Sequence, residues 1–365
     1  MYSPPERLLL GPGPSNVAPT VLQTMNSPLI GHLDPEFIKM MEEIKSMLRL
    51  VFRTENEMTF PVSGTGSAGM EACFVNLVEP GDEVVIGVNG VFGMRMCDVA
   101  ERCGANVTKV EAEWGNIIEP EAIEAALKGR RPKLVAIVHA ETSTGALTPV
   151  EEISRITHEA GALLLLDTVT SLGGCPVSIA EWQVDAVYSG TQKCLSCPPG
   201  LAPISFSPSA MEVISNRNSK VQSWYLDINF LANYWGSERA YHHTAPISMN
   251  YAIHEALRLV LDEGLETRWA RHQQAHETLK SGLANLGLSI TSQEGHQLWQ
   301  LNAISVPSGA NEEKIRTQLL NEFGIEVGPG LGPLKGKIWR VGLMGHNATD
   351  ANVEHFLEAF GKCLA

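Results

Sequence analysis

The sequence predicts an α/β fold in which a large domain with a mainly parallel sheet precedes a smaller C-terminal α+β domain. Short apolar runs typical of buried strands alternate with helix-patterned stretches along the first two thirds of the chain. One run, 162–166, is apolar at every position, as in a strand covered on both faces of a parallel sheet. The length of 365 residues exceeds that of a usual single core and favours two domains.

The large domain is predicted from strand-like runs with helical stretches between them. Helical patterns at 120–128 and 150–160 separate successive runs, so the connections should be right-handed crossovers between mainly parallel strands. The strand-like runs are 84–88, 134–139, 163–167, 186–189 and 201–206.

The second domain is predicted from a shorter set of elements. Two helical stretches, 248–263 and 266–286, end the first domain and lead away from it. We therefore expect an N-terminal segment over 1–20, a large domain over 21–264 and a small domain over 265–365. The small domain should contain strands at 303–306 and 338–343 and helices at 312–323 and 350–364.

Composition excludes several classes of partner. The formal net charge of −14 disfavours nucleic acid and anionic membranes. The apolar runs are too short to span a bilayer, and the first residues do not form a secretory signal. The 7 cysteines are odd in number and lack the spacing of a disulfide framework, which indicates a reducing compartment. We expect a cytoplasmic protein.

A lysine follows the apolar run 186–188. Lys193 lies in the segment SGTQK at 189–193 and precedes Pro198, Pro199 and Gly200. An ammonium on a loop just past a buried strand loses solvation, which lowers its pKa and favours the nucleophilic amine. Lys193 is therefore a candidate to condense with a carbonyl, although a lone lysine of this kind can also be a solvated surface charge.

A carboxylate ends another buried run. Asp167 follows the apolar residues 162–166, at the strand end where ligands of parallel sheets bind. Enzymes that use pyridoxal phosphate pair an aspartate with the pyridine nitrogen and a lysine with the aldehyde. Asp167 and Lys193 fit this pair if they stand on neighbouring strands, and the alternative for Asp167 is a helix or turn cap.

The segment SGTGSAG at 63–69 is a candidate phosphate site. It follows the run 58–62 and precedes a helix-like stretch at 70–77. Glycines let the backbone approach an anion, and hydroxyls and helical N–H groups bind phosphate at the positive end of a helix dipole. The segment lacks the lysine of a Walker A loop and the Rossmann glycine spacing, and an ordinary strand-to-helix turn stays open.

These three sites together resemble those of the class V, fold-type I aminotransferases that depend on pyridoxal phosphate, and within them the alanine-glyoxylate and serine-pyruvate (serine-glyoxylate) group. The resemblance covers nearly the whole chain. It is carried by the segments LGPGPSN (10–16), GH (31–32), EPGD (79–82), HAETSTG (139–145), DTVTS (167–171), SGTQK (189–193), YHHTAP (241–246) and RVGLMG (340–345).

The resemblance implies a role for each matching residue. Lys193 would bind the cofactor covalently and move protons, and Asp167 would pair with the pyridine nitrogen. Arg340 would hold the substrate carboxylate. The remaining cofactor contacts would come from Thr65, Gly66, Ser67 and Gln192 at the phosphate, Thr142 near the ring hydroxyl, Val169 under the ring, and Tyr241 and Thr244 reaching the phosphate of the other subunit of a homodimer.

Two positions depart from the family pattern. Phe92 stands where some relatives have a tryptophan over the cofactor ring, and it should stack in the same way. Ser67 stands where some relatives have histidine, so a backbone contact to phosphate is expected there and a side-chain role stays open.

The resemblance implies transamination from a small amino acid, alanine or serine, to glyoxylate or pyruvate. A lyase or desulfurase of the same class is the alternative, and a non-catalytic protein on this fold is a third reading. A desulfurase needs a reactive cysteine on a mobile loop, and no such loop is evident around Cys73, Cys97, Cys103, Cys175 or Cys363.

Other suggestive residues have plainer interpretations. Cys194 and Cys197 form a C-x-x-C without the second pair that a zinc site requires, so no metal is expected. His242 and His243 are interpreted as interface packing. Glu141, just past a strand, either orients its neighbours or accepts from a backbone amide.

Overall fold

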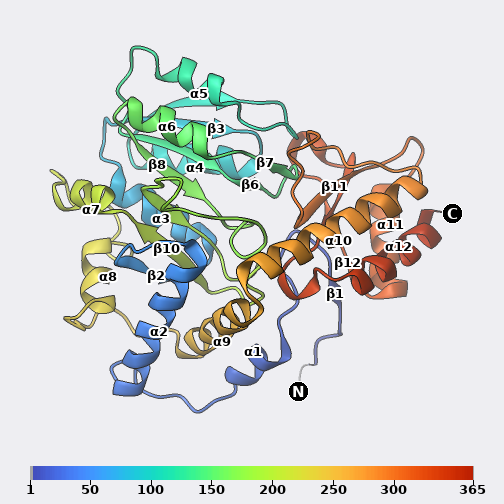
Figure 1. The fold of residues 1–365 in the computed structure, drawn as a ribbon, viewed down its shortest axis with the longest axis horizontal. Coiled ribbons are helices and arrows are strands. Elements are labelled where there is room, and N and C mark those ends of the chain that lie inside the picture. The colour runs from blue at the N-terminus through green and yellow to red at the C-terminus, as the bar shows by residue number, and fades with distance from the viewer. Residues whose placement is uncertain (1–2, 365) are drawn as a thin grey trace.

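A seven-stranded sheet is the centre of the larger part of the computed structural model, which describes residues 3–364 (Figure 1). Its strands follow the order β2-β10-β9-β8-β5-β3-β4, and β10 alone runs antiparallel to its neighbours. The strands are β2 (Met58–Ser63), β3 (Glu83–Val88), β4 (Asn106–Glu111), β5 (Leu134–Val138), β8 (Leu163–Asp167), β9 (Ala186–Tyr188) and β10 (Leu201–Phe206). The predicted α/β class with a mainly parallel sheet is confirmed.

Helices cover both faces of this sheet, because alternate strand residues point to opposite sides. Ile86 and Leu165 face one apolar cluster, whereas Val85 and Leu164 face another. The first face packs against α3 (Gly66–Leu77), α4 (Val91–Arg102), α7 (Pro208–Ser215) and α8 (Ile228–Trp235). The second packs against α1 (Pro19–Thr24), α2 (Pro35–Phe52), α5 (Pro120–Leu127), α6 (Glu151–Glu159) and α9 (Ile247–Glu263).

A second group of elements surrounds a smaller sheet, drawn in orange and red in Figure 1. Strands β11 (Leu301–Ser305), β14 (Ile338–Gly342) and β13 (Gly328–Pro329) pair antiparallel in that order. Helices α10 (Leu265–Asn285), α11 (Glu312–Phe323) and α12 (Asp350–Leu364) supply a separate apolar cluster. Short pairs complete the fold, namely β1 (Leu8–Leu9) with β12 (Ile325–Glu326) and β6 (Ala140–Glu141) with β7 (Ala146–Leu147).

The N-terminal segment is tied to the C-terminal part of the chain. Leu8 and Leu9 pair in parallel with Ile325 and Glu326, and Leu10 is buried in the same cluster as Trp339. Gly264, with a φ of 81°, separates α9 from α10, so the chain turns at the position where the predicted small domain begins. Met1, Tyr2 and Ala365 fall in the predicted terminal ranges and lie outside the described residues.

Most predicted elements occur where the sequence pattern placed them. The helices at 312–323 and 350–364 and the strand at 201–206 have the predicted bounds. The helix expected at 70–77 begins earlier, at Gly66, because the glycine-rich turn itself enters the first helical turn. Within residues 3–364 there is no helix with the length and apolar character needed to cross a bilayer.

Candidate active site

The carboxyl ends of the parallel strands bring the predicted site residues together. Asp167, the last residue of β8, is in register with Val138 of β5 and Tyr188 of β9. The loops after β2, β3 and β9 reach the same edge of the sheet. They line a cavity of about 190 Å³ with Thr65, Gly66, Ser67, Met70, Phe92, Arg95, Asp167, Val169, Tyr188, Gln192 and Lys193.

Lys193 is buried at this cavity with its side chain against the N-terminal segment. Its Nζ donates to the carbonyl oxygen of Pro12. A Cβ on Gly13 would lie 2.6 Å from Nζ, so only a glycine lets the segment pass so close. Burial, with the positive charge of Arg340 as the second cause, lowers the pKa of Lys193 to about 8. The amine is thus available near neutral pH, as the sequence predicted.

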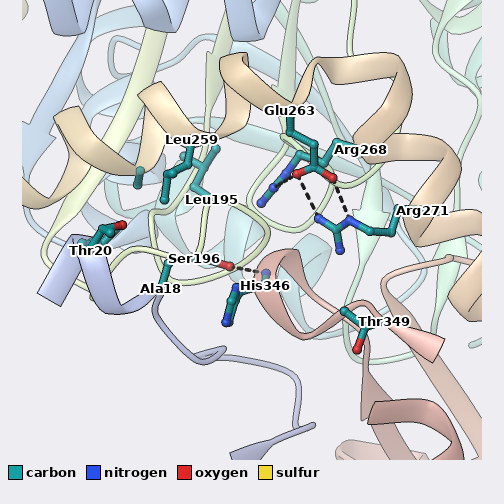
Figure 2. A pocket seen from close by; sticks show the side chains of 12 residues that line it. Ala18, Thr20, Leu195, Ser196, Leu259, Glu263, Arg268, Arg271, His346 and Thr349 are labelled. Carbon is teal, nitrogen blue, oxygen red and sulfur yellow. Dashed lines mark hydrogen bonds and ion pairs between the residues drawn. The ribbon is translucent and has the colours of Figure 1, made fainter. Parts of the chain in front are cut away.

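Hydrogen bonds to its backbone carbonyls hold the loop that carries Lys193. The Ser15 hydroxyl donates to the Lys193 carbonyl (2.8 Å), and the Arg268 guanidinium donates to the Cys194 carbonyl (2.5 Å). Figure 2 shows a cavity of about 410 Å³ beside this loop, in which Glu263 pairs with both Arg268 and Arg271. Because these contacts join α9, α10 and the loop that carries Lys193, the backbone of the lysine is fixed.

Asp167 is buried and is stabilised by two donors. The Tyr188 hydroxyl donates to its Oδ2 (2.6 Å) and the Val169 N–H to its Oδ1 (2.8 Å). The pKa of Asp167 is raised to about 7, because the effect of burial outweighs the opposing effect of these two hydrogen bonds. A protonated heterocyclic nitrogen at this carboxylate would restore its ionised form, because an opposite charge offsets desolvation.

The 63–69 segment forms the N-terminus of α3. Gly66 is the first helical residue, after the N-cap Thr65. A Cβ on Gly66 would lie 3.0 Å from Val169 Cγ2, so the glycine lets the helix end approach the cavity wall closely. The free N–H groups of the first turn and the hydroxyls of Thr65 and Ser67 suit an anion.

Phe92 is fixed through its backbone by Glu141. The buried Glu141 carboxylate accepts from the Phe92 N–H (3.1 Å), the Ser143 N–H (3.0 Å) and the Ser143 hydroxyl (2.6 Å). Burial raises the pKa of Glu141, and these hydrogen bonds oppose the rise. Glu141 therefore has both of the roles that the sequence left open, since it accepts from backbone N–H groups and thereby orients Phe92 and Ser143.

Arg340 projects from β14 toward the lysine and keeps part of its guanidinium free. Its Nε donates to the Pro329 carbonyl (2.7 Å) and its Nη1 to the Thr142 carbonyl (3.2 Å). Within residues 3–364, Nη2 has no hydrogen-bond partner. Burial lowers the pKa of Arg340 to about 10, which leaves it charged.

Four predicted residues lie outside the lining of the Lys193 cavity, namely Arg340, described above, and Thr142, Tyr241 and Thr244. Thr142 is buried and contacts Arg340 through its carbonyl oxygen. Tyr241 and Thr244 are exposed, and the Tyr241 ring lies 5.4 Å from that of His32. Next to them, His242 stacks on Trp224 and His243 contacts the Ser63 hydroxyl.

The residues fit the predicted cofactor, pyridoxal phosphate. The cavity combines a carboxylate for a ring nitrogen, an amine for an aldehyde, and a helix N-terminus for a phosphate. Gln192 also has its Oε1 buried without a partner in the described part of the chain, so this amide keeps hydrogen-bonding capacity for a ligand. Phe92 and Val169 offer apolar surfaces for a planar ring.

The sequence profile of the family described as aminotransferase class-V matches residues 8–356. The chain belongs to the class-V aminotransferase family. It is 40% identical over 366 residues to the alanine–glyoxylate aminotransferase of Mus musculus, covering 99% of this chain and 88% of that protein. It is also 40% identical over 367 residues to the (S)-ureidoglycine–glyoxylate transaminase of Bacillus subtilis, covering 96% and 88%.

A solved structure shows the same architecture. The alanine–glyoxylate aminotransferase of Nostoc sp. is 50% identical and superimposes with a TM-score of 0.98, covering 100% of this chain and 97% of that one. Class-V aminotransferases use pyridoxal phosphate, so the predicted family, enzyme class and cofactor are confirmed.

The cysteines of this aminotransferase lack the features of a desulfurase nucleophile. Cys73, Cys97, Cys103 and Cys175 are buried, and burial raises the pKa of each thiol. Cys363 lies in the last turn of α12. Cys194 and Cys197 are likewise buried, with pKa values raised by burial.

Sequence reasoning missed several residues of the site. Tyr188 is the strand residue that precedes the lysine loop, and its apolar neighbours made it resemble a core residue. Arg95 comes one helical turn after Phe92, a spacing that places both on one face of α4. Pro12, Gly13 and Ser15 come from a segment noted only for its family resemblance.

Proposed function

We propose that this aminotransferase transfers the amino group of a small neutral amino acid, alanine or serine, to glyoxylate or pyruvate. The names of two relatives support glyoxylate as the acceptor, with alanine and (S)-ureidoglycine as their donors. The observation that carries the proposal is Arg340, a buried guanidinium beside Lys193 with an unused Nη2. A planar fork of this kind binds one carboxylate bidentately.

Each side chain has a task that follows from its surroundings. Pyridoxal phosphate supplies the electron sink and carries the amino group when bound. Lys193, with a pKa of about 8, holds or releases a proton near neutral pH and is the candidate general base at the substrate Cα. Asp167 would pair with the ring nitrogen.

The other cofactor contacts are proposed from the lining of the cavity. The phosphate would bind at the start of α3, and the ring would lie between Phe92 and Val169. Thr142 is proposed near the ring hydroxyl because its backbone adjoins Arg340. The phosphate contacts from this chain would be Thr65, Gly66, Ser67 and Gln192.

We also propose a homodimer in which Tyr241 and Thr244 complete the site of the other subunit. Both residues are exposed in the single chain, Tyr241 at 63%, and Trp224, which stacks on the neighbouring His242, is exposed at 61%. Large aromatic surface of this kind is typical of a surface covered by a partner. The division into 1–20, 21–264 and 265–365 and a cytoplasmic location complete the proposal.

Specificity constants for different donors test this function. With glyoxylate as acceptor, kcat/KM for alanine or serine should exceed that for aspartate or glutamate, because the site offers one carboxylate clamp. (S)-Ureidoglycine belongs in the same series. A preference for aspartate or glutamate would overturn the proposal.

A substitution tests the clamp itself. Arg340→Lys keeps the charge and loses the fork, so kcat/KM for alanine should fall at least about tenfold, equivalent to about 1.4 kcal/mol. Arg316→Lys serves as control, since Arg316 of α11 pairs with Glu312 away from the cavity. An unchanged kcat/KM in Arg340→Lys would contradict the assignment.

A further inference from the structure

Arg95 lines the Lys193 cavity, and no carboxylate in the described part of the chain pairs with it. It projects from α4 and is exposed. In the described residues, no carboxylate lies within ion-pair distance of its guanidinium, whereas Arg102 on the same helix pairs with Asp98 at 2.9 Å. An exposed arginine would ordinarily move freely, yet Arg95 is held in place by two contacts.

The first contact is with Phe92. The guanidinium carbon lies 4.9 Å from the centroid of the Phe92 ring, one helical turn earlier. Phe92 is itself fixed by the hydrogen bond from its N–H to Glu141. The stack therefore restricts where the guanidinium can go.

The second contact points to a ligand. Nη1 of Arg95 lies 3.5 Å from the Ser67 hydroxyl, in the first turn of α3. Among the residues that line the cavity, only Lys193 and Arg95 carry a positive charge. A phosphate monoester brings about two negative charges at neutral pH, and Lys193 is committed to the aldehyde end of the cofactor.

We infer that Arg95 is a further ligand of the cofactor phosphate, which it reaches by stacking on Phe92 and approaching Ser67. This inference rests on the proposed cofactor site. The guanidinium supplies the positive charge that hydroxyls and backbone N–H groups cannot, and charge-assisted hydrogen bonds to phosphate are strong. It also explains how the phosphate site can function with Ser67 at the position where some relatives have a histidine.

Binding of two cofactor forms to the full-length protein, freed of cofactor, tests the inference. Arg95→Gln should raise the Kd for pyridoxal phosphate about tenfold or more, because a charge-assisted hydrogen bond is lost. The Kd for pyridoxal, which lacks the phosphate, should change less than about twofold. The loss should shrink at high salt, since the guanidinium is exposed.

Arg102→Gln is the matched control, because Arg102 is on the same helix and does not line the cavity. It should leave both Kd values unchanged. Arg95→Lys should give an intermediate loss for pyridoxal phosphate, since it keeps the charge and weakens the stack.

Two outcomes would overturn the inference. An unchanged Kd for pyridoxal phosphate in Arg95→Gln would remove Arg95 from the phosphate site. An equal loss for both ligands would mean that Arg95 acts only through Phe92. Failure of the unaltered protein to bind pyridoxal phosphate would instead refute the proposed cofactor site, so the two failures are distinguishable.

Discussion

Lys193 is suited to its proposed role because its surroundings favour the neutral amine. Burial is the main cause of its lowered pKa, and the charge of Arg340 adds to it. Asp167 shows the opposite response to burial, since its pKa rises to about 7 despite the Tyr188 hydroxyl. Two groups whose pKa values are displaced toward neutrality in one cavity are typical of an active site.

The lowered pKa predicts how the reactivity of Lys193 depends on pH. The neutral amine is the form that reacts. In the cofactor-free protein, the rate at which an amine-reactive reagent modifies Lys193 should therefore rise with pH, with a midpoint near pH 8. Arg340→Gln should move the midpoint to higher pH, because it removes a neighbouring positive charge.

Peptide mapping by mass spectrometry measures each lysine separately, which makes the exposed lysines internal controls. A midpoint for Lys193 equal to that of the exposed lysines would contradict the burial argument. An unmoved midpoint in Arg340→Gln would contradict the influence of Arg340.

At the scale of elements, the turn after β14 fixes the loop that carries Lys193. Gly345 has a φ of 57°, and a Cβ there would lie 2.7 Å from the Cys194 carbonyl oxygen and overlap the Ser196 hydroxyl. The His346 N–H also donates to the Ser196 hydroxyl (2.7 Å), and Ser196 is itself in the left-handed region. The turn after β14 therefore packs directly against the loop that carries Lys193.

Gly345→Ala should destabilise the protein and weaken its hold on the cofactor. The left-handed backbone costs about 1–2 kcal/mol and the clash about 1–3 kcal/mol more, and the clash displaces the residue after Lys193. Gly336→Ala is the matched control, since Gly336 has a φ of 73° and nothing within 4 Å of its would-be Cβ.

Denaturant unfolding and cofactor retention on dialysis measure the two effects. Gly336→Ala should show the backbone cost alone and keep its cofactor. Equal losses of stability in the two variants would show that the contact with the Cys194 loop contributes nothing.

Much of this element-level arrangement was predictable from sequence. Buried parallel strands are continuous apolar runs, so Asp167 and Lys193 could be placed at strand ends before the structure was known. Arg95 and Tyr188 could not be assigned to the site, because their roles depend on the packing of α4 on α3 and on the register of β9 with β8. The contact of Gly345 with Cys194 joins residues far apart in sequence and depends on how the two parts of the chain pack.

At the scale of the whole molecule, the single chain leaves a group of large aromatic side chains uncovered. Trp224, Tyr225 and Phe230 are exposed around the buried ring of His242, and the exposed Tyr241, next to His242 in the chain, lies near the ring of His32. Thr244 follows in the same segment, and neither it nor Tyr241 lines the Lys193 cavity of its own chain. A second copy that covers this surface would bring both residues toward the other subunit's phosphate, as the proposed dimer requires.

Mixing two inactive variants tests this composite site. A Lys193→Ala chain keeps Thr244, and a Thr244→Val chain combined with Tyr241→Ala keeps Lys193. Random reassociation gives about half heterodimers, in which one of two sites has both contributions, so about a quarter of all sites should recover activity.

Lys193→Ala mixed with Asp167→Asn is the control, because both changes fall in the same chain's part of each site and no intact site can form. Recovery in the first mixture and none in the second is the expected result. No recovery in either, or sedimentation of the active enzyme as a monomer, would mean that each chain builds its site alone, and the uncovered aromatic surface would then need another partner.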